Sequence, residues 1–221
     1  MNRSARKRNK VSALKPETGD GSDNRNKLGL ERLIFFSDAV FAIAITLLAL
    51  EIRLPAGEKT YSDAELLSLL GGMWQHYLAY IISFMVIGIF WMSHHRKFQF
   101  IVKYDRILGL LNLLFLMVIA FIPFPSSVLS EYSGRYATIF YAFTMVLVSL
   151  AMTALWWYAS RRNRLIDPHM SAKQKRQQFL SPLITAAIFL LSIGIAFISP
   201  DLAKLSWWLI LISSMLLTRD N

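Results

Sequence analysis

The 221-residue chain contains no cysteine, which excludes disulfide bonds, thiolate catalysis and metal sites built from cysteine ligands. The first 30 residues also lack the apolar core of a secretory signal peptide. They are polar and basic, so we expect residues 1–30 to form a disordered cytoplasmic tail. The basic cluster at residues 3–10 fits either plain solvation or contact with a membrane surface or an acidic partner.

Acidic residues are scarce: 14 Asp and Glu stand against 24 Lys and Arg, which gives a formal net charge of +10. Such an excess of cations can indicate nucleic-acid binding. Here the cations lie between long apolar runs, where Lys and Arg orient helices and meet anionic lipid head groups. We therefore expect a lipid bilayer as the partner and no nucleic acid.

Apolar residues make up 55% of the chain, and its mean hydropathy is +0.42. A bilayer-spanning helix needs about 20 predominantly apolar residues. Residues 31–221 therefore predict an all-α, six-helix integral membrane domain, whose sixth segment is the shortest. The amphipathic run at residues 61–70 either extends the second helix or lies at the membrane surface. The six predicted spans are residues 33–54, 73–92, 107–128, 137–158, 179–198 and 202–217.

The positive charges predict the orientation of these helices. Twenty of the 24 Lys and Arg residues lie in the first tail, the second-to-third loop, the fourth-to-fifth loop and the carboxyl end. Cytoplasmic segments carry such an excess of cations. We therefore expect a multi-pass protein of the plasma or inner membrane, with both termini in the cytoplasm.

The first predicted helix carries an ionisable residue, Asp38, more than one turn inside the span. A carboxylate at that depth costs several kcal/mol, by an order-of-magnitude estimate, unless it is paired or faces water. The end of the second helix brings His94 and His95 to a similar depth. Adjacent histidines point about 100° apart on a helix, so we expect no metal site. We predict a polar network of Arg32, Ser37, Asp38, Asn112 and one or both histidines, which either clamps the helices together or binds ions directly.

Further along this helix, Ile43, Thr46, Leu47 and Leu50 share one face. Such a stripe is usually a packed helix face. In a symmetric oligomer, the same stripe could surround a central axis. Rings of Ile and Leu would then form a dewetting constriction, and a ring of Thr hydroxyls could touch a passing ion.

The motif Arg32-x-x-x-Phe36-Ser37-Asp38 resembles the signature of the transmembrane protein 175 potassium channel family. The following AVFAIAITLLALEI looks like that family's first helix. Two later segments also resemble the family: FWMSHHRKF at residues 90–98 and LNLLFLMVIAFIPFPSS at residues 111–127. The resemblance covers residues 32–127 well.

The resemblance implies a prokaryotic-type homotetramer with six helices per chain and the first helices around a central pore. It implies a constriction at Ile43, Leu47 and Leu50, a hydroxyl layer at Thr46 linked with potassium preference, and no Thr-Val-Gly-Tyr-Gly filter, a run this sequence lacks. The residues implied to support the pore helix are Arg32, Phe36, Ser37, Asp38, His94, His95 and Asn112.

A potassium-permeable channel without cofactors, with potassium as the permeant ion, is therefore the leading prediction. The alternative is a proton-coupled secondary transporter that uses Asp38 with His94 or His95. Gly88 and the Pro123/Pro125 pair are not at midplane positions of matched halves, as broken transporter helices would be. A membrane enzyme ranks last, because Ser37 and Asp38 are adjacent on a helix and face different directions.

Overall fold

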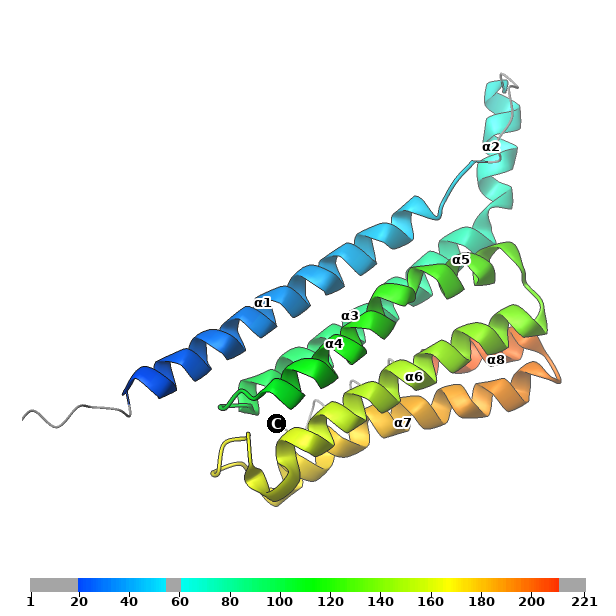
Figure 1. The fold of residues 1–221 in the computed structure, drawn as a ribbon. Helices are drawn as coiled ribbons and strands as arrows, with labels where there is room; N and C mark the ends of the chain where they lie inside the picture. The colour runs from blue at the N-terminus through cyan, green and yellow to red at the C-terminus, as the bar shows by residue number, and fades with distance from the viewer. Residues whose placement is uncertain (1–19, 55–60, 211–221) are drawn as a thin grey trace, which may run out of the picture.

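The computed structural model describes residues 20–54 and 61–210, which fold into a bundle of helices (Figure 1). Within these residues there is no β-sheet, only an isolated bridge between Ile101 and Ile166. The elements in chain order are α1 (Asp20–Leu50), α2 (Asp63–Gly72), α3 (Trp74–Phe100), α4 (Arg106–Phe121), α5 (Pro123–Glu131), α6 (Arg135–Ser160), the 3₁₀ turn η1 (Arg161–Asn163), α7 (Ala172–Ala196) and α8 (Pro200–Ser206).

Five helical segments of the described residues are long and apolar enough to cross a membrane. They correspond to the first five predicted spans. The sixth prediction, residues 202–217, is helical in α8 and again at residues 208–210, and residues 211–217 lie outside the described residues. The five segments are Asn26–Leu50, Trp74–Phe100, Arg106–Glu131, Arg135–Asn163 and Ala172–Ala196.

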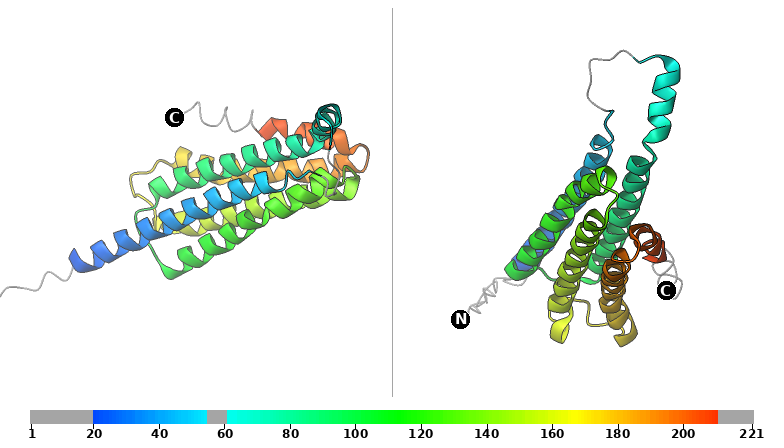
Figure 2. Two further views of the ribbon diagram at one scale, coloured as in Figure 1. Left: turned by 90° about the horizontal axis from the view of Figure 1, so that it is seen from above. Right: turned by 90° about the vertical axis from the view of Figure 1, so that its right-hand side faces the viewer.

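Apart from α2, the long helices run side by side along the length of the bundle (Figures 1 and 2). α1 packs against α3, α4 and α5, and α4 and α5 pack in turn against α6. α6 and α7 form an antiparallel hairpin, and α8 packs against both. α1 therefore lies at one side of the bundle, with α8 across the bundle from it (Figure 2).

The prediction of a disordered tail up to residue 30 is wrong for residues 20–30, which form the start of α1. Tertiary contacts stabilise this polar turn of helix. The Tyr104 ring lies between Gly29 and Gly109, so close that a Cβ on Gly29 would lie 3.0 Å from the ring. Leu30 also packs against a buried apolar cluster. Residues 1–19 lie outside the described residues.

The prediction that the second helix ends at Met92 is also wrong, because α3 continues to Phe100. Three polar side chains of this extension, Ser93, His94 and Lys97, are buried between helices. The Lys97 ammonium donates to Ser93 Oγ at 2.9 Å and to Gln178 Oε1 of α7 at 3.3 Å. A polar run that lipid would not tolerate is accepted here because neighbouring helices supply its hydrogen-bond partners.

Two further breaks shape the bundle. α2 is a separate helix that turns away from the axis of α3 at Met73 (Figure 1). Its start is a capping box, in which hydrogen bonds from the Ser62 backbone and hydroxyl lower the pKa of the Glu65 carboxyl. The third span is interrupted at Ile122, because Pro123 lacks a backbone N–H and begins α5.

The buried lysine yields a stability prediction. Gln178→Leu removes the interhelical acceptor of Lys97, so the free energy of unfolding should fall by about 1–3 kcal/mol. Lys97→Met replaces the buried amine by an apolar side chain of similar length and should cost less than Gln178→Leu, because it leaves only neutral oxygens, and no ammonium, without a partner. The measurement is the thermal unfolding midpoint of purified protein in detergent.

The double variant Lys97→Met/Gln178→Leu supplies the control. It should regain most of the stability lost in Gln178→Leu, because both partners are then apolar. A loss in the double variant equal to the sum of the two single losses would show that the hydrogen bond between α3 and α7 does not matter.

Candidate functional site

One face of α1 is buried against its own chain. Ser37, Phe41, Ala44 and Leu48 follow one another at helical spacing, and each is almost completely inaccessible. These residues meet α3, α4 and α5, the three helices that pack against α1. The inward face of α1 is therefore fixed by packing within one subunit.

The opposite face of α1 carries the predicted constriction residues, and its side chains point away from their own chain. Ile43 is 58% exposed, Leu47 40% and Leu50 60%. Thr46 is exposed between them, and its hydroxyl donates to the Ile43 carbonyl at 2.9 Å. Since this bond uses the hydroxyl proton, the oxygen lone pairs of Thr46 remain free to accept.

A buried hydrogen-bond chain ties α1 to α4 and α3. The Ser37 hydroxyl donates to the Leu33 carbonyl at 2.7 Å, so its oxygen accepts from Asn112 Nδ2 at 2.8 Å. Asn112 Oδ1 then faces His94 Nε2 at 2.9 Å. Because that amide oxygen can only accept, His94 must carry a proton on Nε2. The directions of all three bonds are thus set by the backbone carbonyl at the start of the chain.

Aromatic rings enclose the histidine end of this chain. His94 stacks on Phe98 at a centroid distance of 4.2 Å and on Phe115 at 5.5 Å. Phe41 of α1 approaches the same imidazole at 5.7 Å. The ring therefore cannot turn to solvent, and its hydrogen bond to Asn112 is made in an apolar surrounding, where losing it is costly.

Asp38 lies outside this buried chain, contrary to the prediction of one joint network. It follows Ser37 by one residue, so its side chain points about 100° away around the helix. Asp38 Oδ1 accepts from Trp91 Nε1 at 2.9 Å. Trp91 stacks on His95, whose Nε2 lies 3.1 Å from Gln99 Nε2. Two separate polar groups thus hold α1, one through Asn112 of α4 and the other through Trp91 of α3.

The remaining predicted network residues are exposed. Phe36 is half exposed, and Arg32 takes part in neither polar group among the described residues. Within residues 20–54 and 61–210, no group of three or more His, Cys, Asp or Glu side chains could hold a metal ion.

Comparison with known proteins decides the family. The sequence model described as "Endosomal/lysosomal potassium channel TMEM175" matches residues 32–123. A protein named as a potassium channel from Streptomyces collinus is 41% identical over 176 residues, which are 77% of this chain and 84% of the relative. Another from Chamaesiphon minutus is 36% identical over 182 residues, 76% of this chain and 89% of the relative.

The chain belongs to the TMEM175 family. This membership confirms the resemblance in the sequence motifs, and it places the chain among multi-pass membrane proteins of a channel family rather than among enzymes. The crystal structure of a "lysosomal potassium-selective channel TMEM175 homolog" from Chamaesiphon minutus has the same fold. It matches with a TM-score of 0.74 and 31% identity, over 85% of this chain and 97% of that chain.

The match to the TMEM175 sequence model covers the helices that carry the candidate site. Residues 32–123 include most of α1 and all of α3 and α4, and thus every predicted site residue. Sequence reasoning missed Trp91 as the partner of Asp38. A signal for its bond to Asp38 was available, because both residues are near the same end of antiparallel spans. Sequence reasoning also missed Lys97 and Gln178, because their pairing joins helices far apart in the chain.

Asn112→Leu tests the buried chain. The substitution removes one amide and orphans both the Ser37 oxygen and the His94 Nε2–H, so the free energy of unfolding should fall by about 1–3 kcal/mol for each orphaned group. Unfolding in detergent, followed by circular dichroism, measures the loss.

Gln99→Leu is the matched control, since Gln99 is exposed and its amide lies against His95, outside the buried chain. It should change the unfolding midpoint little. Equal losses for the two variants would mean that the position of Asn112 in the buried chain carries no special stability.

Proposed function

We propose that the chain is the subunit of a potassium-permeable channel whose pore is lined by α1. The single observation that carries this proposal is the stripe of Ile43, Thr46, Leu47 and Leu50, which lies in the segment matched by the TMEM175 model and is exposed on the side of α1 that faces away from its own chain. The names of its bacterial relatives as potassium channels support the permeant ion.

The assembly is a homotetramer, with the four stripes facing one axis. Rings of Ile43, Leu47 and Leu50 then exclude water at rest, and a widening of the α1 helices admits hydrated ions. Thr46 offers its lone pairs to a dehydrating cation and thereby sets the potassium preference. The protein lies in the plasma or inner membrane with both termini in the cytoplasm, which the distribution of Lys and Arg supports.

The supporting groups keep the stripe turned toward the axis. Rotation of α1 by one residue would break the bond between Ser37 and Asn112 and the bond between Asp38 and Trp91 at once. These bonds lie on two neighbouring faces of α1, so together they define its rotation about its own axis. Arg32 and Phe36 complete the motif on the exposed side.

The transporter alternative has weaker support. Its proposed proton relay joins Asp38 to His94 or His95. Asp38 bonds to Trp91 and His94 bonds to Asn112, while His95 pairs with Gln99 and reaches Asp38 only through the Trp91 ring. The curated bacterial relatives are also named as channels. Passive flow down the gradient therefore accounts for the family and the site together.

Potassium flux into liposomes tests the pore. Ile43→Asn and Leu47→Asn each place an amide in the proposed dewetted ring, so wetting becomes easier and flux should rise several-fold. Leu150→Asn on α6 is the matched control, because Leu150 is 47% exposed on a helix separated from α1 by α4 and α5. Flux through all three variants equal to that of the unchanged protein would remove α1 from the pore.

In the same assay, Thr46→Ala should narrow the difference between potassium and sodium flux, whereas Thr46→Ser should keep it.

Cross-linking tests the arrangement of subunits. In a cyclic tetramer, a residue meets its own copy only close to the axis. The chain has no cysteine, so Leu50→Cys introduces a single thiol. Mild oxidation should give disulfide-linked dimers on a non-reducing gel, whereas Leu150→Cys should stay monomeric on that gel. Monomers alone from Leu50→Cys would argue against convergence of the α1 helices, even if flux persisted.

A further inference from the structure

A cavity of about 240 Å³ lies between the start of α3, the end of α5 and α8. Its wall is apolar: Ala79, Ile82 and Leu129 are buried there, and Leu78 and Leu205 complete it. Two partly exposed tryptophans, Trp74 and Trp208, form its sides. No residue of α1 lines it, and α8 lies across the bundle from α1 (Figure 2).

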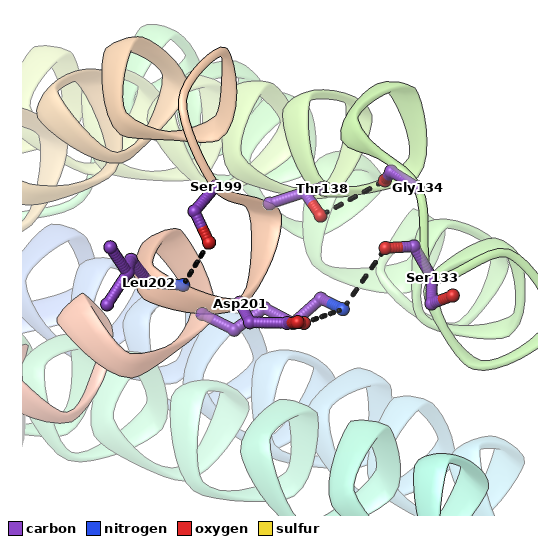
Figure 3. Close-up of polar contacts among 7 residues, drawn as sticks. Ser133, Gly134, Thr138, Ser199, Asp201 and Leu202 are labelled. Atoms are coloured by element: carbon purple, nitrogen blue, oxygen red, sulfur yellow. Dashed lines mark hydrogen bonds and ion pairs between the residues drawn. The ribbon is translucent and has the colours of Figure 1, made fainter.

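The mouth of the cavity is polar and carries one cation. Lys204 Nζ donates to Asp201 Oδ1 at 3.3 Å and to the Ser133 carbonyl at 3.4 Å (Figure 3). Both hydrogen bonds are long, and an ammonium group has three protons to donate. The Lys204 side chain is only 15% exposed, whereas its partner Asp201 is 86% exposed. Asp201 can therefore turn into water and leave the ammonium to another anion.

The position of the cavity points to lipid. Trp74 and Trp208 have the place typical of membrane–water interfaces, and Lys204 lies on the side with few cations. A cleft with an apolar body inside the bilayer and a cation at head-group level matches the layout of a phospholipid. A metal cation is disfavoured there by the ammonium itself.

We propose that this cavity is a binding site for one glycerophospholipid, with an acyl chain between Trp74 and Trp208 and the phosphate on Lys204. The phosphate supplies the third hydrogen-bond acceptor and replaces Asp201 as the anion. The site lies on the opposite side of each subunit from the α1 stripe, so it faces lipid in the tetramer. The binding itself does not depend on whether α1 conducts ions.

Other occupants are less suitable. A second copy of this chain would have to cover an ammonium and an exposed carboxylate, which is costly inside a bilayer. Residues 211–221 come shortly after Trp208 in the sequence and are the competing occupant from within the chain. Occupation of the cavity by these residues would exclude an acyl chain from it, so the two possibilities give opposite results in a quenching experiment.

The test uses purified full-length protein, delipidated in detergent and titrated with phosphatidylglycerol under native mass spectrometry. One lipid per chain should persist at collision energies that strip the others. Lys204→Gln should weaken this binding at least about tenfold, a change of about 1.4 kcal/mol. Lys173→Gln is the control. It removes an exposed lysine at the start of α7, which changes the net charge by the same amount, and it should not weaken binding of the lipid.

Two further measurements separate the head group from the chain. Diacylglycerol with the same acyl chains lacks the phosphate and should bind to the unchanged protein no better than phosphatidylglycerol binds to Lys204→Gln. Leu205→Trp adds volume at an exposed position of the wall and should expel the lipid while Lys204 remains.

Phosphatidylglycerol brominated along its acyl chain locates the occupant. It should quench the fluorescence of Trp74 and Trp208. The contribution of each tryptophan is the difference in quenching between the unchanged protein and the variant Trp74→Phe or Trp208→Phe. Equal binding of phosphatidylglycerol and diacylglycerol, or no effect of Lys204→Gln, would overturn the proposal. Absence of quenching at both tryptophans would overturn it as well, because the cavity would then be filled by protein.

Discussion

The hydrogen bond between Ser37 and Asn112 is the contact on which the geometry of this protein depends. Lipid offers no partner to a polar group, so a hydroxyl or an amide inside a bilayer is stable only where another helix completes it. The Leu33 carbonyl accepts the hydrogen bond of the Ser37 hydroxyl. The Ser37 oxygen must then accept from Asn112, and this sets the direction of each bond as far as His94. This chain cannot form if α1 turns about its axis, and it therefore defines which residues of α1 face outward.

Buried polar groups recur at other junctions between helices. Ser83 of α3 lies 2.8 Å from Ser126 of α5 and donates to the Tyr141 hydroxyl of α6 at 3.1 Å. Trp207 donates to Ser192 of α7 at 2.9 Å, and Lys97 joins α3 to Gln178. Apolar contact alone does not distinguish one helix packing from another in lipid, since acyl chains are as apolar as leucine. These few polar pairs supply the specificity that the apolar surfaces lack.

Hydropathy predicted the first five spans, because length and apolar content are local properties of the chain. It failed at Met92, where Ser93, His94 and Lys97 looked like a helix end facing water. Their partners, Asn112 and Gln178, are 18 and 81 residues away in the chain, and no local pattern contains them. The start of α1 was missed for a similar reason, because Tyr104, in the connection between α3 and α4, packs against residue 29. Asp38 could be recognised as needing a partner, but the choice of Trp91 depended on the rotation of two helices.

The stripe of Ile43, Leu47 and Leu50 shows why exposure has a different meaning in a membrane than in water. In water, three exposed apolar side chains in a row would indicate a missing partner, since their burial is favourable by roughly 25 cal/mol per Å². In lipid that free-energy gain disappears, so the stripe could face acyl chains at no cost. Its assignment to a pore therefore needs a reason for its direction. The bonds of Ser37 and Asp38 fix this direction, because they leave α1 one outward face. The proposal of a pore then rests on Thr46, which lies on this face between the apolar residues, in the segment matched by the TMEM175 model.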